Sequence, residues 1–309
     1  LRAIYLKMSL YHIILILIAV PDCLKSQFLG GLFTWSPIEQ PSQIRISYRF
    51  SWRRSFSSNY FCNSSQIASD ELRHGDGSIS CIRGCNGTVT QLEYYCTGFS
   101  ETEDWTTGTR GFLYNLTKTS QEVAFRLTGC CWIHLQMRED SDWSMKASGL
   151  VVQRFDTGRI NSSPVTSISA ITRVVYGCNA TIKLLVSDAD GDIVRCRWSN
   201  GSDECGSICS SFPGAVLNEE TCTISCQATK EVGYYVAAIQ VEDFPATGGI
   251  IPFSSIPVQF LVDVYYTNKR CDQLPEFIAP TRNDEEIVYV IAEKMYFDQV
   301  VAISNSPNK

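Results

Sequence analysis

The stretch Ile44–Arg53, "IRISYRFSWR", alternates between apolar and polar side chains. Its apolar members are Ile44, Ile46, Tyr48, Phe50 and Trp52. A period of two is that of a β-strand, because successive side chains of a strand point to opposite faces. The stretch therefore predicts a strand with one buried and one solvated face.

The same alternation recurs in short segments, with Gly, Asn, Asp and Ser between them. These segments are Val123–Leu127, Ile133–Met137, Ile182–Val186, Val194–Trp198, Tyr235–Val241 and Phe260–Val264. No long segment carries an apolar stripe with the helical period. Regularly spaced short strands of this kind are typical of β-sandwiches. We therefore predict an all-β chain of tandem β-sandwich domains stapled by disulfides.

Cysteines form two groups of six. The first group is Cys62, Cys81, Cys85, Cys96, Cys130 and Cys131, and the second is Cys178, Cys196, Cys205, Cys209, Cys222 and Cys226. Such a density is expected where disulfides persist, outside the reducing cytosol. The simplest assignment closes three disulfides within each group, with no connectivity given by sequence. Cys130 and Cys131 point to opposite faces if they lie in a strand, which predicts different partners for them.

Some cysteines allow other interpretations. Cys81 and Cys85, like Cys205 and Cys209, have a spacing that zinc accepts, but no histidine is near and an oxidising compartment favours disulfides. Cys271 is left over. We expect its partner in a third module that continues beyond Lys309, with an intermolecular disulfide as the alternative.

The chain divides at the polar run Asp156–Ser167, "DTGRINSSPVTS", which reads as a linker or first loop. Residues 1–26 are predicted to be a secretory signal, because the apolar run Ile13–Val20 is too short to span a bilayer and follows Lys7. We predict a cysteine-rich β domain over 27–160, an immunoglobulin-like sandwich with a cysteine-rich insert over 161–267, and the start of a truncated third module over 268–309.

Six N-x-S/T sequons support export: Asn63, Asn86, Asn115, Asn161, Asn179 and Asn200. Pro164 makes the Asn161 sequon a poor acceptor. A formal net charge of −6 argues against nucleic acid as a partner. We predict an extracellular location, secreted or as an ectodomain, with extracellular proteins or glycans as partners. Any membrane attachment would use a segment outside this chain.

The loop "DADGD", Asp188–Asp192, places three carboxylates in five residues between two predicted strands. Calcium suits such a loop, because it takes 6–8 oxygen ligands and tolerates irregular geometry. The EF-hand pattern does not fit, since Ile193 stands where glycine is required. A solvated turn built on Asp190 and Gly191 explains the same residues. The sequence leaves both interpretations open.

The strand before "DADGD", the following strand that ends in Trp198, and the later "GYYVAAIQVED" resemble immunoglobulin-like modules of the cadherin-like and polycystin-repeat type, found in large metazoan extracellular proteins. The resemblance covers about residues 164–265. It implies that Asp188, Asp190 and Asp192 converge with Asp243 on a metal. The insert between Cys205 and Cys226 is foreign to those modules, and the "GYYVAAIQV" strand lacks the cysteine of the usual intersheet bridge.

The sequence offers few residues that could form a catalytic site, and we expect that the protein is not an enzyme. Outside the signal the histidines are His74 and His134, in polar or solvated positions, which leaves no partner set for a nucleophile. The main hypothesis is a structural or adhesion module with calcium as its only cofactor. The alternative is a glycan- or protein-binding ectodomain, with Trp105 as the stacking face and Trp52 in the core.

Overall fold

The computed structural model describes residues 27–38, 42–85, 87–117, 121–137, 141–228, 231–273, 275–282, 288–291 and 294–303. The predicted signal peptide and the Asn86 sequon lie outside the described residues. Within the described part no helix has the length and apolar character needed to cross a membrane.

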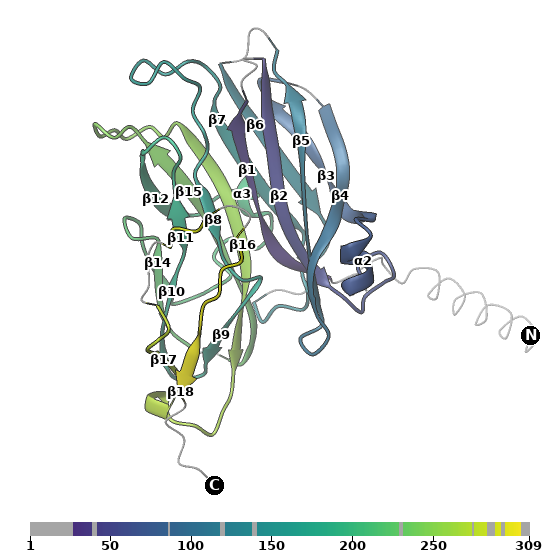
Figure 1. Cartoon of the computed structure of the whole chain (residues 1–309), viewed down its shortest axis with the longest axis vertical. Coiled ribbons are helices and arrows are strands. Elements are labelled where there is room, and N and C mark those ends of the chain that lie inside the picture. Colours follow the sequence, from purple (N-terminus) through teal and green to yellow (C-terminus); the bar gives the residue numbers. More distant parts are fainter. Residues whose placement is uncertain are drawn as a thin grey trace, which may run out of the picture.

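Seven strands and one short helix make up the amino-terminal half. They are β1 (Phe28–Pro37), β2 (Gln43–Arg53), β3 (Leu72–Arg83), β4 (Gly87–Ser100), β5 (Trp105–Asn115), β6 (Glu122–Gly129) and β7 (Trp143–Leu150), with α2 (Ser64–Ala68). They hydrogen-bond in the order β1-β2-β5-β4-β3-β6-β7. The sheet curls on itself around one core (Figure 1).

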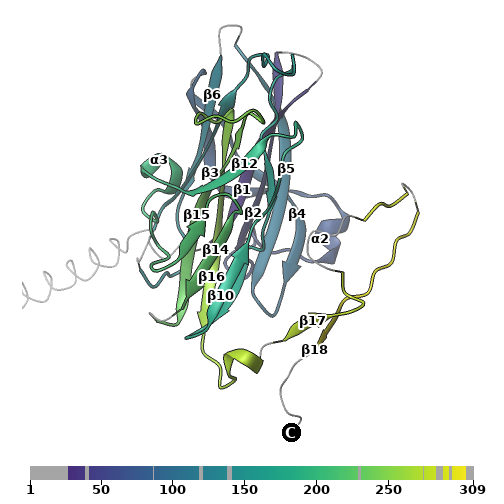
Figure 2. The ribbon, with the colours of Figure 1, turned by 90° about the vertical axis from the view of Figure 1, so that its left-hand side faces the viewer.

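The carboxyl-terminal half adds shorter strands around one long hairpin. These are β8 (Val165–Ser167), β9 (Ile171–Val175), β10 (Asn179–Lys183), β11 (Leu185–Ser187), β12 (Ile193–Trp198), β13 (Val216–Asn218), β14 (Thr223–Gln227), β15 (Gly233–Phe244) and β16 (Ser254–Tyr265), with α3 (Ser202–Cys205). The β10-β14-β13 sheet covers the outer side of the β12-β15-β16 layer (Figures 1 and 2). A tail follows with η2 (Cys271–Gln273), β17 (Glu276–Ile278) and β18 (Val301–Ile303).

Strand β16 belongs to both halves. One edge pairs along its length with β15. The other edge pairs in succession with β7 at Ser254–Ser255, with β1 at Val258–Phe260, and in parallel with β9 at Leu261–Tyr265. The last long strand therefore closes the ring of the first seven strands and joins both halves into one sheet.

Aromatic side chains fill the core of the first half. The Phe28 ring centroid lies 4.7 Å from that of Trp132 and 4.4 Å from that of Trp143, and Trp52 stacks on Tyr94 at 4.3 Å. All five side chains are buried. Because fully burying one large apolar side chain contributes roughly 1.5–3 kcal/mol, these rings are a main source of its stability.

The predicted fold class is confirmed: the chain is all-β, built of tandem β-sandwich units with several disulfides. In β2 the apolar positions from Ile44 to Trp52 are all buried, as the period of two predicts. Two strand predictions differ from the structure. Ile133–Met137 forms no strand, and the predicted strand Ile182–Val186 is interrupted at buried Leu184, between β10 and β11.

The disulfide assignment is confirmed for the first group, whose six cysteines pair among themselves, and requires correction for the second group and for Cys271. The structure pairs Cys62 with Cys96, Cys81 with Cys85, Cys130 with Cys131, Cys178 with Cys271, Cys196 with Cys222, and Cys205 with Cys209. Cys271 thus finds its partner within the chain, and Cys226 is left as a buried thiol. Grouping by sequence position failed because β9 and β16 pair in parallel and bring Cys178 close to the tail. Cys130 and Cys131 bond to each other in the loop after β6, where strand alternation does not apply.

The Asp188–Asp243 cluster and the loops beside it

Three of the four predicted metal ligands meet in space. Asp188 and Asp192 lie in the loop between β11 and β12, and Asp243 lies near the end of β15. One carboxylate oxygen of each is within 4.8 Å of the other two. Asp190 is not part of this group, because its Oδ2 accepts a hydrogen bond from the Ser162 backbone N–H at 2.6 Å.

The guanidinium group of Arg154 neutralises much of the negative charge of the acidic cluster. Arg154, only 3% exposed, forms two hydrogen bonds to Asp192, the one from Nη2 to Oδ1 at 2.7 Å, and two to Asp156 at 2.9 and 2.7 Å. Its charged head lies 4.1 Å from the centre of the Phe253 ring. The hydrogen bonds that Arg154 donates to both carboxylates raise the pKa of Arg154, and the same hydrogen bonding lowers the pKa of Asp156. The loop is therefore held by an internal ion pair.

Asp243 is fully buried at the base of the cluster. Its Oδ1 accepts from the Ser254 N–H at 2.7 Å and from the Ser254 hydroxyl at 2.5 Å, and its Oδ2 accepts from Asn161 Nδ2 at 2.5 Å. Burial, with the nearby Asp188 charge, raises the pKa of Asp243 to about 6. Asp243 thus fastens the start of β16 to the end of β15.

Asp188 has the one carboxylate oxygen of the cluster without a protein partner. Its Oδ1 accepts from the backbone N–H groups of Asp190 and Asp192 at 2.8 and 3.1 Å, which is a side-chain-capped turn. Its Oδ2 is buried and makes no hydrogen bond. Burial raises the pKa of Asp188. The cluster could bind a metal through Asp188, Asp192 and Asp243.

Sequence reasoning missed Arg154 and misassigned Asn161. Both lie in or beside the run taken as a linker, where charged and amide groups are usually solvated. Asn161 is fully buried, and its Oδ1 accepts from Arg154 at 2.7 Å, so it cannot carry a glycan in this fold. The useful signal was electrostatic: a dense acidic loop next to a buried core calls for a counter-charge.

The remaining sequons of the described part stay compatible with glycosylation. Asn115, Asn179 and Asn200 are exposed. Asn63 is half-buried and caps α2, with its Oδ1 accepting from the N–H groups of Ser65 and Gln66. Their glycosylation stays a prediction.

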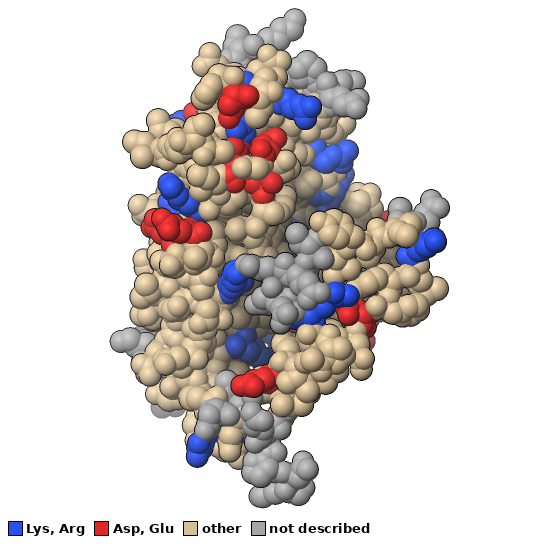
Figure 3. All heavy atoms as spheres, turned by 60° about the vertical axis from the view of Figure 1, so that its left-hand side comes forward, with Lys and Arg blue, Asp and Glu red and all other residues tan. Residues whose placement is uncertain are grey.

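Two loops with bare apolar tips flank the cluster. Phe155 is 88% exposed in the loop after β7, and Ile250 and Ile251 are 93% and 73% exposed in the β15–β16 loop. The loops lie side by side, because Leu150 N–H donates to the Phe253 carbonyl and Arg154 stacks on the Phe253 ring. Both are at the end of the molecule opposite the C-terminal tail, where acidic and basic side chains gather beside each other (Figures 1 and 3). We call Phe155, Ile250 and Ile251 the apolar tip.

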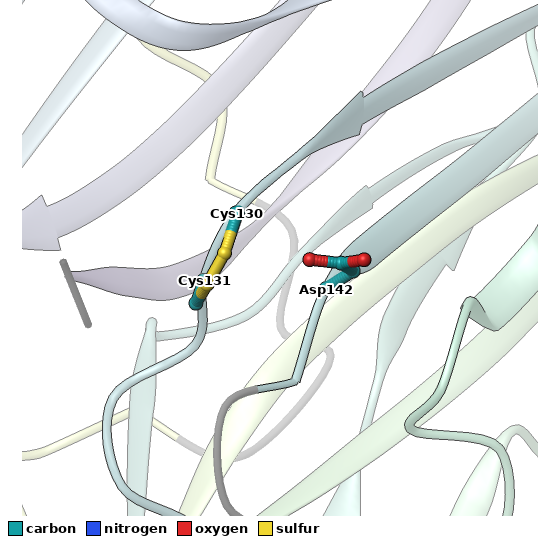
Figure 4. A group of neighbouring side chains, drawn as sticks. All are labelled: Cys130, Cys131 and Asp142. Carbon is teal, nitrogen blue, oxygen red and sulfur yellow. A yellow bond between two sulfur atoms is a disulfide. The ribbon is translucent and has the colours of Figure 1, made fainter. Parts of the chain in front are cut away.

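A second group of ligand-type atoms, Cys130, Cys131 and Asp142, is a weaker candidate. The two sulfur atoms are bonded to each other, with the Asp142 carboxylate beside them (Figure 4). Disulfide sulfurs are not the thiolates that bind metals. This group is therefore a structural staple in its oxidised form.

The tryptophans of the first half are mostly core residues. Trp35, Trp52, Trp132 and Trp143 are buried, which confirms the interpretation of Trp52. Trp105 is half-buried, and its indole N–H donates to Glu103 at 2.9 Å. Neither His74 nor His134 is buried.

Comparison with known proteins finds similarity to integrin beta-like proteins. The sequence family described as "Integrin beta-like protein A-E, N-terminal" matches residues 29–149, which end within β7. Integrin beta-like protein C of Dictyostelium discoideum is 26% identical over 168 residues, and integrin beta-like protein A is 23% identical over 242 residues. The chain is similar to the amino-terminal region of integrin beta-like proteins.

The alignments cover 53% and 75% of this chain but only 8% and 12% of those two relatives. The chain thus spans a small part of the length of the curated relatives it matches.

Solved structures similar in fold are tandem immunoglobulin-type proteins. The two V-type regions of VCBP3, a v-region-containing chitin binding protein, match with a TM-score of 0.33 at 10% identity, covering 75% of this chain and all of that one. A chimeric titin Z1Z2 tandem matches with a TM-score of 0.24 at 10% identity, covering 73% and 91%. The immunoglobulin-like module of the cadherin-like or polycystin-repeat type stays a prediction.

Proposed function

We propose that this chain is a non-catalytic adhesion module of an extracellular protein, and that it makes contact through the apolar tip. The supporting observation is the placement of Phe155, Ile250 and Ile251. Exposed apolar side chains on neighbouring loops are candidate contact points, because burying apolar surface contributes roughly 25 cal/mol for each Å². The similarity to integrin beta-like proteins and the disulfide content agree with this role.

The tip is suited to contact because its base is rigid. The Arg154 ion pairs and the Asp243 hydrogen bonds hold both loops to the β15–β16 hairpin. A pre-organised loop loses little conformational entropy on binding, which leaves more of the contact energy as affinity. The tip also faces away from the C-terminal tail (Figure 1).

Bead retention tests the proposal. Beads coated with the full chain are layered on cells, and the fraction retained under shear is compared with that for Phe155→Ser/Ile250→Ser/Ile251→Ser. We expect the triple variant to lose at least tenfold in retention. The matched control is Leu185→Ser/Val216→Ser/Tyr266→Ser, which removes exposed apolar side chains elsewhere. Equal retention of wild type and the tip variant would refute an adhesive tip.

A second proposal concerns calcium in the acidic cluster. It is supported by the unpartnered Asp188 Oδ2 and by the three converging carboxylates. Calcium accepts irregular oxygen sets, and here it would take Asp188 together with free lone pairs of Asp192 and Asp243. Arg154 competes for the same charge, so the ion would have to displace or share Asp192 with the guanidinium.

Thermal unfolding of the full chain, with disulfides intact, tests whether calcium or the Arg154 guanidinium balances the charge of the acidic loop. A ligand that binds only the folded state raises the midpoint. In millimolar calcium we expect the midpoint to rise by a few degrees relative to chelator for wild type and for Asp70→Asn, an exposed control. Asp188→Asn should abolish the shift. Superimposable wild-type curves would mean that Arg154 alone balances the loop.

A further inference from the structure

A pocket of about 330 Å³ lies between the end of β12 and the cysteine-rich insert. Its apolar walls are Trp198, Phe212, Pro213, Ala215, Val236 and Ala238. The Cys196–Cys222 and Cys205–Cys209 disulfides fix the strand and the insert on either side. The pocket is therefore built by covalent staples outside the acidic cluster.

The pocket also presents one unsatisfied buried polar group. Ser211 is 3% exposed, lines the pocket, and has an Oγ with no hydrogen-bond partner. Ser210, next to it, is exposed and adopts a φ of 62°. A buried hydroxyl without a partner costs about 1–3 kcal/mol. A fitting occupant combines an apolar face with polar edges, as a pyranose ring does.

A source of such a ring lies at the rim. The sequon Asn200-Gly201-Ser202 begins two residues after Trp198, and Asn200 is exposed. Ser199, which lies between them, still pairs with β15, because its N–H donates to the carbonyl of Ala238, a lining residue of the pocket, at 2.9 Å. The Gly201 carbonyl lies 3.6 Å from Cys209 Sγ, directly before Ser210, so the sequon abuts the pocket wall.

We propose that the first sugar of an N-linked glycan on Asn200 occupies this pocket. Its C–H face lies against Trp198, and its polar groups satisfy the hydroxyls of Ser210 and Ser211. An aromatic ring offers a broad apolar surface at low entropic cost, which suits stacking on one sugar face. The glycan then completes the core of the insert as a structural part of the fold.

Enzymatic release of glycans from the native protein tests this. The full chain is secreted from a eukaryotic host and treated with a peptide N-glycosidase without denaturation, and release at each site is followed by mass spectrometry. We expect release at Asn200 to be at least tenfold slower than at Asn179, an exposed sequon on β10 that lies outside the lining of the pocket. Trp198→Ala and Ser211→Ala should remove the difference, and Trp198→Phe should retain most of it.

Substitutions that remove a sequon and leave the pocket residues unchanged give a second test, with the unfolding midpoint as the measurement. Ser202→Ala abolishes the Asn200 sequon and should lower the unfolding midpoint, whereas Thr181→Ala, which abolishes the Asn179 sequon, should not. An unoccupied Asn200, or equal release at both sites together with an unchanged midpoint for Ser202→Ala, would overturn the proposal.

Discussion

At the scale of single residues, buried polar side chains decide how the end of the molecule that carries the apolar tip is held. Arg154 neutralises Asp192 and Asp156 while Asn161 bridges Arg154 to Asp243. Removing one partner of such a network leaves an uncompensated buried charge, which typically costs 3–5 kcal/mol. The loop that looks like excess negative charge in the sequence is therefore one side of a network.

Asp243 should make stability depend on pH. Because its folded pKa is raised to about 6, the folded state retains a proton that the unfolded chain has released, and the free energy of unfolding falls as pH rises from about 4 to about 6. The total effect is at most about 3 kcal/mol. Chemical denaturation at pH 5 and pH 7 measures it, and Asp243→Asn should flatten the difference. An unchanged pH difference in this variant, with Asp70→Asn as control, would contradict the assignment.

Residue patterns predicted some of these groups and missed others. Asp188 and Asp192 were named because carboxylates at alternate loop positions are a visible pattern, and Asp243 was named through the resemblance to immunoglobulin-like modules. Arg154 and the burial of Asn161 were not, because a polar run containing glycine and proline looks solvated. Arg154 packs against Phe253 and Asn161 bonds to Asp243, both far away in the sequence, and no local pattern records those contacts.

At the scale of elements, β1 and β16 approach each other unusually closely. Gly30 has a φ of +123° and lies opposite Phe260, and a Cβ added there would meet the Gln259 carbonyl oxygen. Only glycine tolerates both the backbone conformation and the proximity. The glycine pair that opens β1 is thus the joint between the two halves.

Gly30→Ala should destabilise the chain by at least about 2 kcal/mol, because strain at positive φ adds to a clash with backbone. Gly248→Ala is the matched control, since its φ of +89° is also positive but nothing lies near the added Cβ. We expect the control to cost about 1 kcal/mol. Comparable midpoints of urea unfolding for both variants would show that Gly30 has room for a Cβ next to β16.

Strand β2 was predictable because its period of two is a local consequence of one buried face. The role of β16 was not predictable. A strand that is buried on both faces has the same apolar sequence pattern whichever strands pair with its edges. The Cys178–Cys271 bond depends on that pairing and was missed for the same reason.

At the scale of the whole molecule, the two halves are one hydrogen-bonded body. A fragment of residues 164–265 would leave the edge of β16 that pairs with β1 and β7 open, and Cys178 without Cys271. We expect it to aggregate or to unfold at least ten degrees below the full chain in thermal scans. A fragment with the midpoint of the full chain would show that the halves are energetically independent.

The Cys178–Cys271 disulfide also determines how the molecule responds to pulling. Tension applied at the C-terminal tail enters at Cys271 and passes through the sulfur bridge to Cys178, so the 93-residue span between them carries no load. Strand β16 lies inside that span and is shielded from extension. A pull between the amino-terminal half and the C-terminal tail would thus pass through this covalent bond, and the chain of the β15–β16 hairpin would not be extended.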